Sequence, residues 1–175
     1  MKFRNTPMIN TAKLSLRFIN DTDIDDVIEL MTNSEISKTF MVYELKSRED
    51  EIKMFEKFKM MSNSEEYFVY GISLQGKMIG FINVVEIKGS EVEVGYVVHP
   101  NYKNNGFATE ALGAAIQELL DSGYTAVKTG AFEDNIASIR VMQKCGMQRI
   151  EEEDFIEYRG RVHRCIYYKY ERATK

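Results

Sequence analysis

The chain has 175 residues, enough for one domain with a sizeable core and too few for two of ordinary size. It carries 23 Lys plus Arg against 27 Asp plus Glu, a formal charge of −4, whereas neutralising nucleic-acid phosphates requires a basic excess. No segment reaches the length of a membrane span or of the apolar core of a signal peptide. We therefore expect one domain over residues 1–175, cytoplasmic, a monomer or a homodimer, with neither nucleic acid nor membrane as partner.

Cysteine and histidine are scarce. Cys145 and Cys165 are the only cysteines and form no CxxC motif, and His99 and His163 are the only histidines. Zinc-type sites usually need several such ligands at short spacings. We predict two reduced thiols and no metal site.

The first third of the chain predicts one strand and two helices. Residues 12–18 alternate apolar and polar, as a half-buried strand does. The polar cluster 20–23 supplies capping side chains for a helix whose apolar residues recur at helical spacing over 24–31. A second helix is expected over 48–61. The connecting segment 38–43 is apolar and lacks turn residues, so we expect it to cover another part of the molecule.

The rest of the chain predicts a meander followed by alternating elements. Strands are expected over 67–72, 78–87 and 91–98, then a helix over 106–121, a strand over 126–132, a helix over 135–145 and two strands near 147–158 and 161–170. Pro100 ends the third strand of the meander, and Gly146 ends the last helix. This order predicts an α/β (mixed α+β) fold with a central mixed, mostly antiparallel sheet of about seven strands flanked by about four helices.

The most informative segment runs from residue 97 to residue 109. A strand ends there, an Asn- and Gly-rich turn follows, and a helix begins at once. Backbone N–H groups of such a turn, with the helix dipole, form an anion site that suits a pyrophosphate. Gly106 and Ala108 allow close approach, and Lys103 adds a positive charge. The alternative is an ordinary turn that uses Asn and Gly for their conformational freedom.

Three motifs together resemble the GCN5-related N-acetyltransferase (GNAT) superfamily. Lys103-x-x-Gly106-x-Ala108 is similar to its pyrophosphate loop, and the segment from Asn135 through Ser138 to Gly146 is similar to its Asn-x-x-(Ala/Ser)…Lys-x-Gly-Phe helix. Residues 91–98 resemble its central strand, and the order of elements agrees from residue 14 to residue 170. The branch that the chain resembles most is the ribosomal-protein alanine/serine N-acetyltransferases.

The resemblance implies that acetyl-CoA is the co-substrate and that its acetyl group passes directly to a primary amine. The acceptor would be a protein N-terminal α-amine, or a small amine such as a polyamine, amino sugar or antibiotic. A non-catalytic CoA-binding regulatory module is the other possibility. In the family the central strand parts from its neighbour at a bulge, which leaves backbone groups free for the pantetheine arm and the thioester oxygen. The residues expected to contact acetyl-CoA are Val97, Val98, Lys103, Asn104, Asn105, Gly106, Phe107, Ala108, Thr109, Asn135, Ser138 and Met142.

Glu93 is the candidate general base. Strand alternation places Val92, Val94, Tyr96 and Val98 on one face and Glu91 and Glu93 on the other, so Glu93 is expected to face the cleft near the thioester. There it could take a proton from an ammonium through one water. The alternative is a solvated carboxylate on a strand face, and the sequence does not choose decisively between Glu91 and Glu93.

Two residues depart from the family pattern. Met142 occupies the position where many members carry a Tyr that protonates the leaving thiolate. Ser138 could take that role, or the thiolate could leave unaided, since a thiol has a pKa of about 8.5. Lys103 replaces the usual Gln or Arg and is a point charge, so weaker phosphate binding is expected.

An acidic run lies at residues 151–154, followed by Glu157. It could attract a cationic substrate. We favour the simpler interpretation, a solvated edge of a strand.

Overall fold

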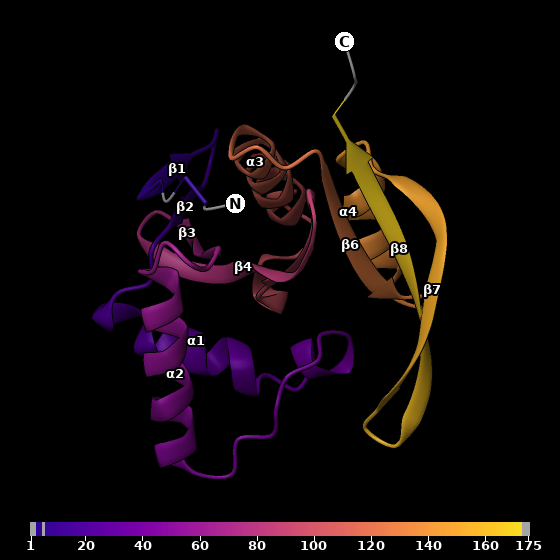
Figure 1. Ribbon diagram of the computed structural model, residues 1–175. Helices are drawn as coiled ribbons and strands as arrows, with labels where there is room; N and C mark the ends of the chain where they lie inside the picture. Colours follow the sequence, from indigo (N-terminus) through magenta and orange to yellow (C-terminus); the bar gives the residue numbers. More distant parts are fainter. Residues whose placement is uncertain (1–2, 5, 173–175) are drawn as a thin grey trace.

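Eight strands form one mixed sheet in the computed structural model of the protein, which describes residues 3–4 and 6–172 (Figure 1). The strands follow the order β1-β2-β3-β4-β5-β6-β8-β7, and only the β5–β6 pair is parallel. The strands are β1 (Met8–Asn10), β2 (Ser15–Arg17), β3 (Val69–Leu74), β4 (Lys77–Lys88), β5 (Glu91–Val98), β6 (Ala126–Phe132), β7 (Gln148–Tyr158) and β8 (Arg161–Glu171). The helices are α1 (Ile24–Thr32), α2 (Arg48–Ser62), α3 (Phe107–Asp121) and α4 (Ile136–Lys144), with 3₁₀ turns at Asp21–Asp23, Ile36–Lys38 and Pro100–Tyr102.

This architecture confirms the predicted fold class and the order of the elements. The sheet has one strand beyond the expected number, because β1 is only three residues long and such a short segment shows no readable alternation. The central strand β5 begins and ends at the predicted residues. Its length is set by two strong local signals, the Gly89 turn before it and Pro100 after it.

Helices cover both faces of the sheet (Figure 1). On one face α3 and α4 pack against β4, β5 and β6, and the core there is built around Leu112, Ile116 and Val94. On the other face α1 and α2 pack over β3 and β4, around Phe55, Phe81 and Val97. Alternation along β5 therefore divides its side chains between two separate cores. Glu93 belongs to the face of α1 and α2.

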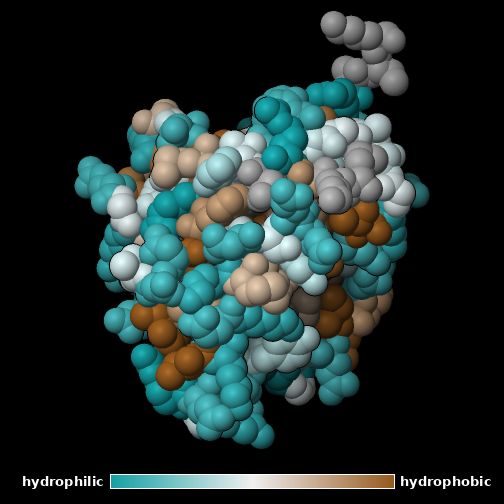
Figure 2. Space-filling model, turned by 60° about the vertical axis from the view of Figure 1, so that its left-hand side comes forward, coloured by the Kyte–Doolittle hydropathy of each residue, from teal (hydrophilic) through white to brown (hydrophobic). Residues whose placement is uncertain are grey.

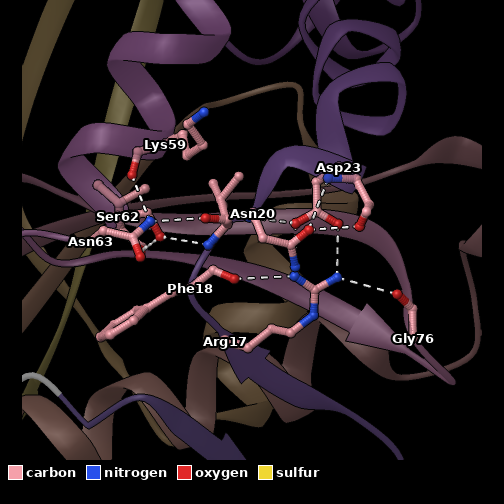
Figure 3. A network of polar contacts seen from close by, with 11 residues as sticks. Arg17, Phe18, Asn20, Asp23, Lys59, Ser62, Asn63 and Gly76 are labelled. Carbon is pink, nitrogen blue, oxygen red and sulfur yellow. Dashed lines mark hydrogen bonds and ion pairs between the residues drawn. The ribbon is translucent and has the colours of Figure 1, made fainter.

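A buried polar network fixes α1 and α2 to the strands beneath them (Figure 3). Arg17 of β2 binds both carboxylate oxygens of Asp23, at 2.7 and 2.8 Å, and also donates to the carbonyl of Gly76. The Ser62 hydroxyl at the end of α2 donates to the carbonyl of Val69 and accepts from the N–H of Ile19. Because both helix ends are bonded to the sheet, the wall that they form beside β5 is held in place.

The face of the molecule in Figure 2 is mostly hydrophilic, with apolar residues gathered in separate patches. Over the residues that the structure describes, no helix is long and apolar enough to cross a membrane. Within the same residues no group of three or more His, Cys, Asp or Glu side chains could hold a metal ion.

Candidate active site

The central feature is a split between the two parallel strands. β5 and β6 pair only from Glu91 opposite Ala126 to Glu93 opposite Lys128. Beyond that point β6 pairs with β8 and β5 pairs with β4, so in the described ladder one edge of β5 is open from residue 94 to residue 98. The predicted divergence is present. The bulge, however, lies in β4, between Val84 and Glu86, and not in the central strand itself.

The phase of the β4–β5 ladder decides which backbone groups face the split. His99 N–H donates to the Ile79 carbonyl at 2.7 Å, and a Cβ added to Gly80 would lie 2.2 Å from the Val97 carbonyl oxygen. Val97 therefore directs its backbone toward β4. Since alternate residues of an antiparallel strand bond to opposite sides, Val98 and Tyr96 direct their N–H and C=O groups into the split. Of the two backbone contacts predicted from the sequence, the one at Val98 is available and the one at Val97 is taken up by β4.

The turn between β5 and α3 has the geometry of an anion site. Asn104 and Gly106 both have positive φ, 63° and 79°, and the Asn105 amide holds the turn by donating to the carbonyls of Tyr102 and Lys103. The first helical hydrogen bond runs from Glu110 N–H to the Gly106 carbonyl, and Gly106 offers no capping side chain. The backbone N–H groups of Phe107, Ala108 and Thr109 therefore have no carbonyl acceptor within the helix, and they are free to bind an anion.

The side chains around this turn leave it open. Lys103, Asn104, Asn105 and Gly106 are exposed. Glu110 would repel a phosphate from the first turn of α3, but its carboxylate binds the Thr11 hydroxyl and the Lys13 N–H instead. These bonds fix the carboxylate against residues 11–13 but do not remove its negative charge.

The helix on the other side of the split carries two of the predicted residues at its start. The Asn135 side chain caps α4 by accepting from the Ser138 N–H at 3.2 Å. Ser138 is half-buried one turn into the helix. Met142 is fully buried in the core beneath α3, with 0% of its surface exposed. That position leaves Met142 no surface with which to contact acetyl-CoA, which corrects the sequence-based expectation.

Tyr96 is the residue that sequence reasoning missed. Its hydroxyl lies 2.8 Å from the Ser138 hydroxyl, bridging β5 to α4 across the split. Helical side chains lean toward the N-terminus, so a Tyr at position 142 would carry its hydroxyl back toward Ser138, where the Tyr96 hydroxyl lies. Burial raises the pKa of Tyr96, with the Ser138 hydrogen bond opposing, so the phenol stays protonated and can donate. The helix lacks the Tyr that many family members carry at the position of Met142, but the phenol of Tyr96 on the facing strand lies close to where that hydroxyl would be.

We expect Tyr96→Phe to lower kcat by up to about 10²-fold, the low end of general acid catalysis, because a thiolate needs little help to leave. Ser138→Ala should lower kcat less, since the phenol remains. Steady-state kinetics and calorimetry with CoA would separate this effect from weaker binding. Tyr124→Phe is the matched control, because the Tyr124 hydroxyl is buried and has no partner among the described residues. A full kcat in Tyr96→Phe would show that the pair only joins the strand to the helix.

Glu93 lies at the point where the strands diverge, on the face opposite Tyr96. Its carboxylate is 3.2 Å from the Lys128 ammonium, and 17% of its side chain is exposed. Lys128 is buried, binds Glu152 at 2.7 Å and lies over the Tyr167 ring. Lys128 therefore keeps a second carboxylate partner when Glu93 changes. Glu91, one strand repeat earlier, pairs with Lys169 and lies away from the open part of β5.

The environment of Glu93 suits a base. Burial raises the pKa of its carboxyl group, and the hydrogen bond and charge of Lys128 oppose this rise. A carboxylate with a raised pKa holds a proton more firmly than an exposed carboxylate does, which suits a general base. The acidic run on β7 partly serves this arrangement: Glu152 binds Lys128, Glu153 binds Arg164, and Asp154 accepts from the Tyr167 hydroxyl.

The apolar connection between α1 and α2 covers part of this face through Phe40, whereas Met41 and Tyr43 of the same connection are exposed. Phe40 packs edge-on against Phe81, and its ring lies 3.5 Å from where a Cβ on Gly95 would be. The Tyr158 hydroxyl of β7 donates to the Ser37 carbonyl at 2.9 Å. The segment is thus tied to the β7–β8 hairpin, and together they border the space in front of Glu93.

Neither cysteine has a nucleophile's environment. Burial raises the pKa of Cys145 to about 11, and its Sγ donates to the Thr109 carbonyl. Burial also raises the pKa of Cys165, which is 6% exposed. Both thiols are therefore protonated at neutral pH.

Comparison with known proteins agrees with this geometry. Residues 13–148 match the sequence profile of the acetyltransferase (GNAT) domain. The uncharacterized N-acetyltransferase YoaA of Bacillus subtilis is 27% identical over 148 residues, covering 82% of this chain and 84% of the relative. The uncharacterized N-acetyltransferase YnaD of the same organism is 30% identical over 147 residues, covering 81% and 82%.

Solved structures share the fold. RimL, the ribosomal L7/L12 α-N-protein acetyltransferase in complex with coenzyme A, superposes with a TM-score of 0.82 at 17% identity, covering 94% of this chain and 97% of that one. The microcin C7 self-immunity acetyltransferase MccE, in complex with acetyl-CoA and AMP, gives 0.78 at 20% identity, covering 93% and 94%. The matched profile spans most of the chain, and the chain therefore belongs to the GNAT family of acetyl-CoA-dependent N-acetyltransferases.

Proposed function

We propose that the protein transfers the acetyl group of acetyl-CoA directly to a protein N-terminal α-amine, with Glu93 as the general base. The observation that carries the proposal is the position of Glu93. It is the last residue of β5 paired with β6, so its carboxylate lies where the open backbone edge of the strand begins. A group that removes a proton and groups that bind an oxyanion are thereby placed beside one another.

Each step of the transfer has a residue to serve it. Acetyl-CoA supplies the thioester, and the free amides at the start of α3 bind its pyrophosphate. Glu93 takes the proton from the attacking amine, directly or through one water. A backbone N–H of Tyr96 or Val98 stabilises the negative charge on the thioester oxygen. As the C–N bond forms and the C–S bond breaks, the Tyr96–Ser138 pair donates a proton to the thiolate, and the pair regains a proton from solvent after CoA leaves. The protonated cysteines support direct transfer without an acyl-cysteine.

The α-amine is favoured on chemical grounds. A free α-amine has a pKa of about 7.7–8.0 against about 10.4 for lysine, so one carboxylate base is sufficient to expose its lone pair. The likeness of the fold to RimL, whose substrate is the N-terminus of a ribosomal protein, supports the same acceptor class.

A panel of acceptors tests the proposal. Thiol release from acetyl-CoA should show higher kcat/KM for peptides with a free α-amine than for the same peptides with a blocked N-terminus and one lysine. Polyamines and amino sugars should be poorer still. Clear preference for lysine or a small amine would contradict the acceptor class, and no turnover with any amine in a CoA-binding protein would favour a regulatory module.

A further inference from the structure

A cationic pocket lies beside the face of the sheet that carries Glu93. It has a volume of about 350 Å³ and lies between the segment after α1, the β6–α4 connection and the β7–β8 hairpin. Its lining residues are Lys38, Thr39, Asp134, Tyr158, Arg159, Arg161 and His163. Three of them are permanent cations and one is a carboxylate, in a protein whose net charge is −4. The pocket's charge is thus opposite to that of the chain as a whole.

Neither arginine has an ion-pair partner among the residues described, whereas Lys38 is already paired with Glu35. The Nε of Arg159 donates to the Tyr158 hydroxyl at 3.2 Å and its guanidinium lies over the Tyr158 ring, which holds it at the pocket wall. Arg159 and Gly160 occupy the hairpin turn with φ of 51° and 71°. Gly, Asn or Asp is usual at such a position, so an arginine there goes against local preference. Its guanidinium forks match the geometry of a carboxylate or phosphate.

The pocket is connected to the face that carries Glu93. Along β6, Lys128 and Phe132 point to the same side, and Phe132 stacks on His163 with ring centres 4.2 Å apart. Four residues of strand separate Lys128, the partner of Glu93, from that ring stack, about 13 Å at roughly 3.3 Å per residue. An extended peptide whose α-amine lies at Glu93 covers this distance with about four residues.

We propose that the cationic pocket binds an acidic side chain of the acceptor, about four residues from its α-amine. The inference rests on the proposed function and adds a specificity to it: the enzyme prefers N-termini that carry a carboxylate near position 4. Arg159 and Arg161 supply the charge, and the Thr39 hydroxyl is a neutral donor in the lining. The Asp134 carboxylate repels an acidic side chain placed against the start of α4. This repulsion narrows the range of peptide positions at which an acidic residue fits the pocket.

Two decapeptides that differ only by Glu or Gln at position 4 test this proposal. Each exposed ion pair contributes up to about 5-fold, so with two arginines the wild-type kcat/KM for the Glu peptide should be roughly 2- to 30-fold higher and should fall with added salt. Arg159→Gln with Arg161→Gln should abolish the preference by lowering kcat/KM for the Glu peptide to the value measured for the Gln peptide. Arg149→Gln, an exposed arginine of β7 outside the pocket, is the matched control. Moving the acid to position 8 should remove the advantage.

The outcomes separate this inference from the proposed function. Equal rates for the Glu and Gln peptides, or a preference that survives the double variant, would overturn the pocket's role while peptide acetylation stands. If no N-terminal peptide is acetylated and a small phosphorylated or carboxylated amine is, both the acceptor class and the peptide register are wrong.

Discussion

Glu93→Gln is expected to lower kcat by roughly 10²–10⁴-fold, the usual contribution of a general base. The amide keeps the shape of the side chain and loses only its basicity. Lys128 retains Glu152 as a partner, so the variant should remain folded. CoA affinity should change little, because the free amides lie at the start of α3. Raising the pH should partly restore the rate by deprotonating the amine in solution. Steady-state kinetics across pH would measure all three effects.

Glu91→Gln is the control for this prediction, since Glu91 shares the strand face and also pairs with a lysine. The sign of the pH dependence provides a second check. Wild-type kcat/KM should fall as the pH drops through the raised pKa of Glu93, because the protonated carboxyl cannot accept a proton. Lys128→Met removes the charge that opposes this rise, so the acidic limb should move up by about 1 pH unit or more, and Lys128→Arg should restore it. A near-normal kcat in Glu93→Gln, or an equal loss in Glu91→Gln, would refute the assignment.

Gly106→Glu is expected to abolish acetyl-CoA binding. Gly106 precedes the free amides of α3 with φ of 79°, and a carboxylate there would both repel the pyrophosphate and strain the turn. Isothermal titration calorimetry with CoA should show loss of detectable heat in a protein whose circular dichroism is unchanged.

Gly89→Glu separates repulsion of the pyrophosphate from backbone strain as the cause of the lost binding. Gly89 lies in the β4–β5 turn with φ of 62°, and a Cβ added there would meet open space, as it would at Gly106. It therefore suffers similar backbone strain without approaching the phosphate site, and its CoA affinity should match the wild type. Unchanged CoA affinity in folded Gly106→Glu would show that the turn is an ordinary connection.

Local sequence patterns predict much of the fold and part of the candidate site. The bounds of β5, the helix after Gly106 and the face of Glu93 follow from period-2 alternation, from turn residues and from helical spacing, and each depends only on neighbours in the chain. The same holds for the anion-binding turn, whose Asn104 and Gly106 adopt positive φ where the motif requires it. Such signals are strong because a few adjacent residues set the backbone conformation.

Other features depend on contacts between distant segments. The choice of Val98 over Val97 as the free backbone group follows from the register of β4 against β5, which a single strand does not encode. The Tyr96–Ser138 bond and the Lys128–Glu93 ion pair each join elements far apart in sequence. The cationic pocket likewise gathers residues from three separate segments of the chain. Periodicity specifies which face a side chain occupies, but its partner depends on how the helices and the hairpin pack around the split. The proposed base could therefore be named from the chain alone, whereas the proposed proton donor and the proposed acceptor pocket required the packed structure.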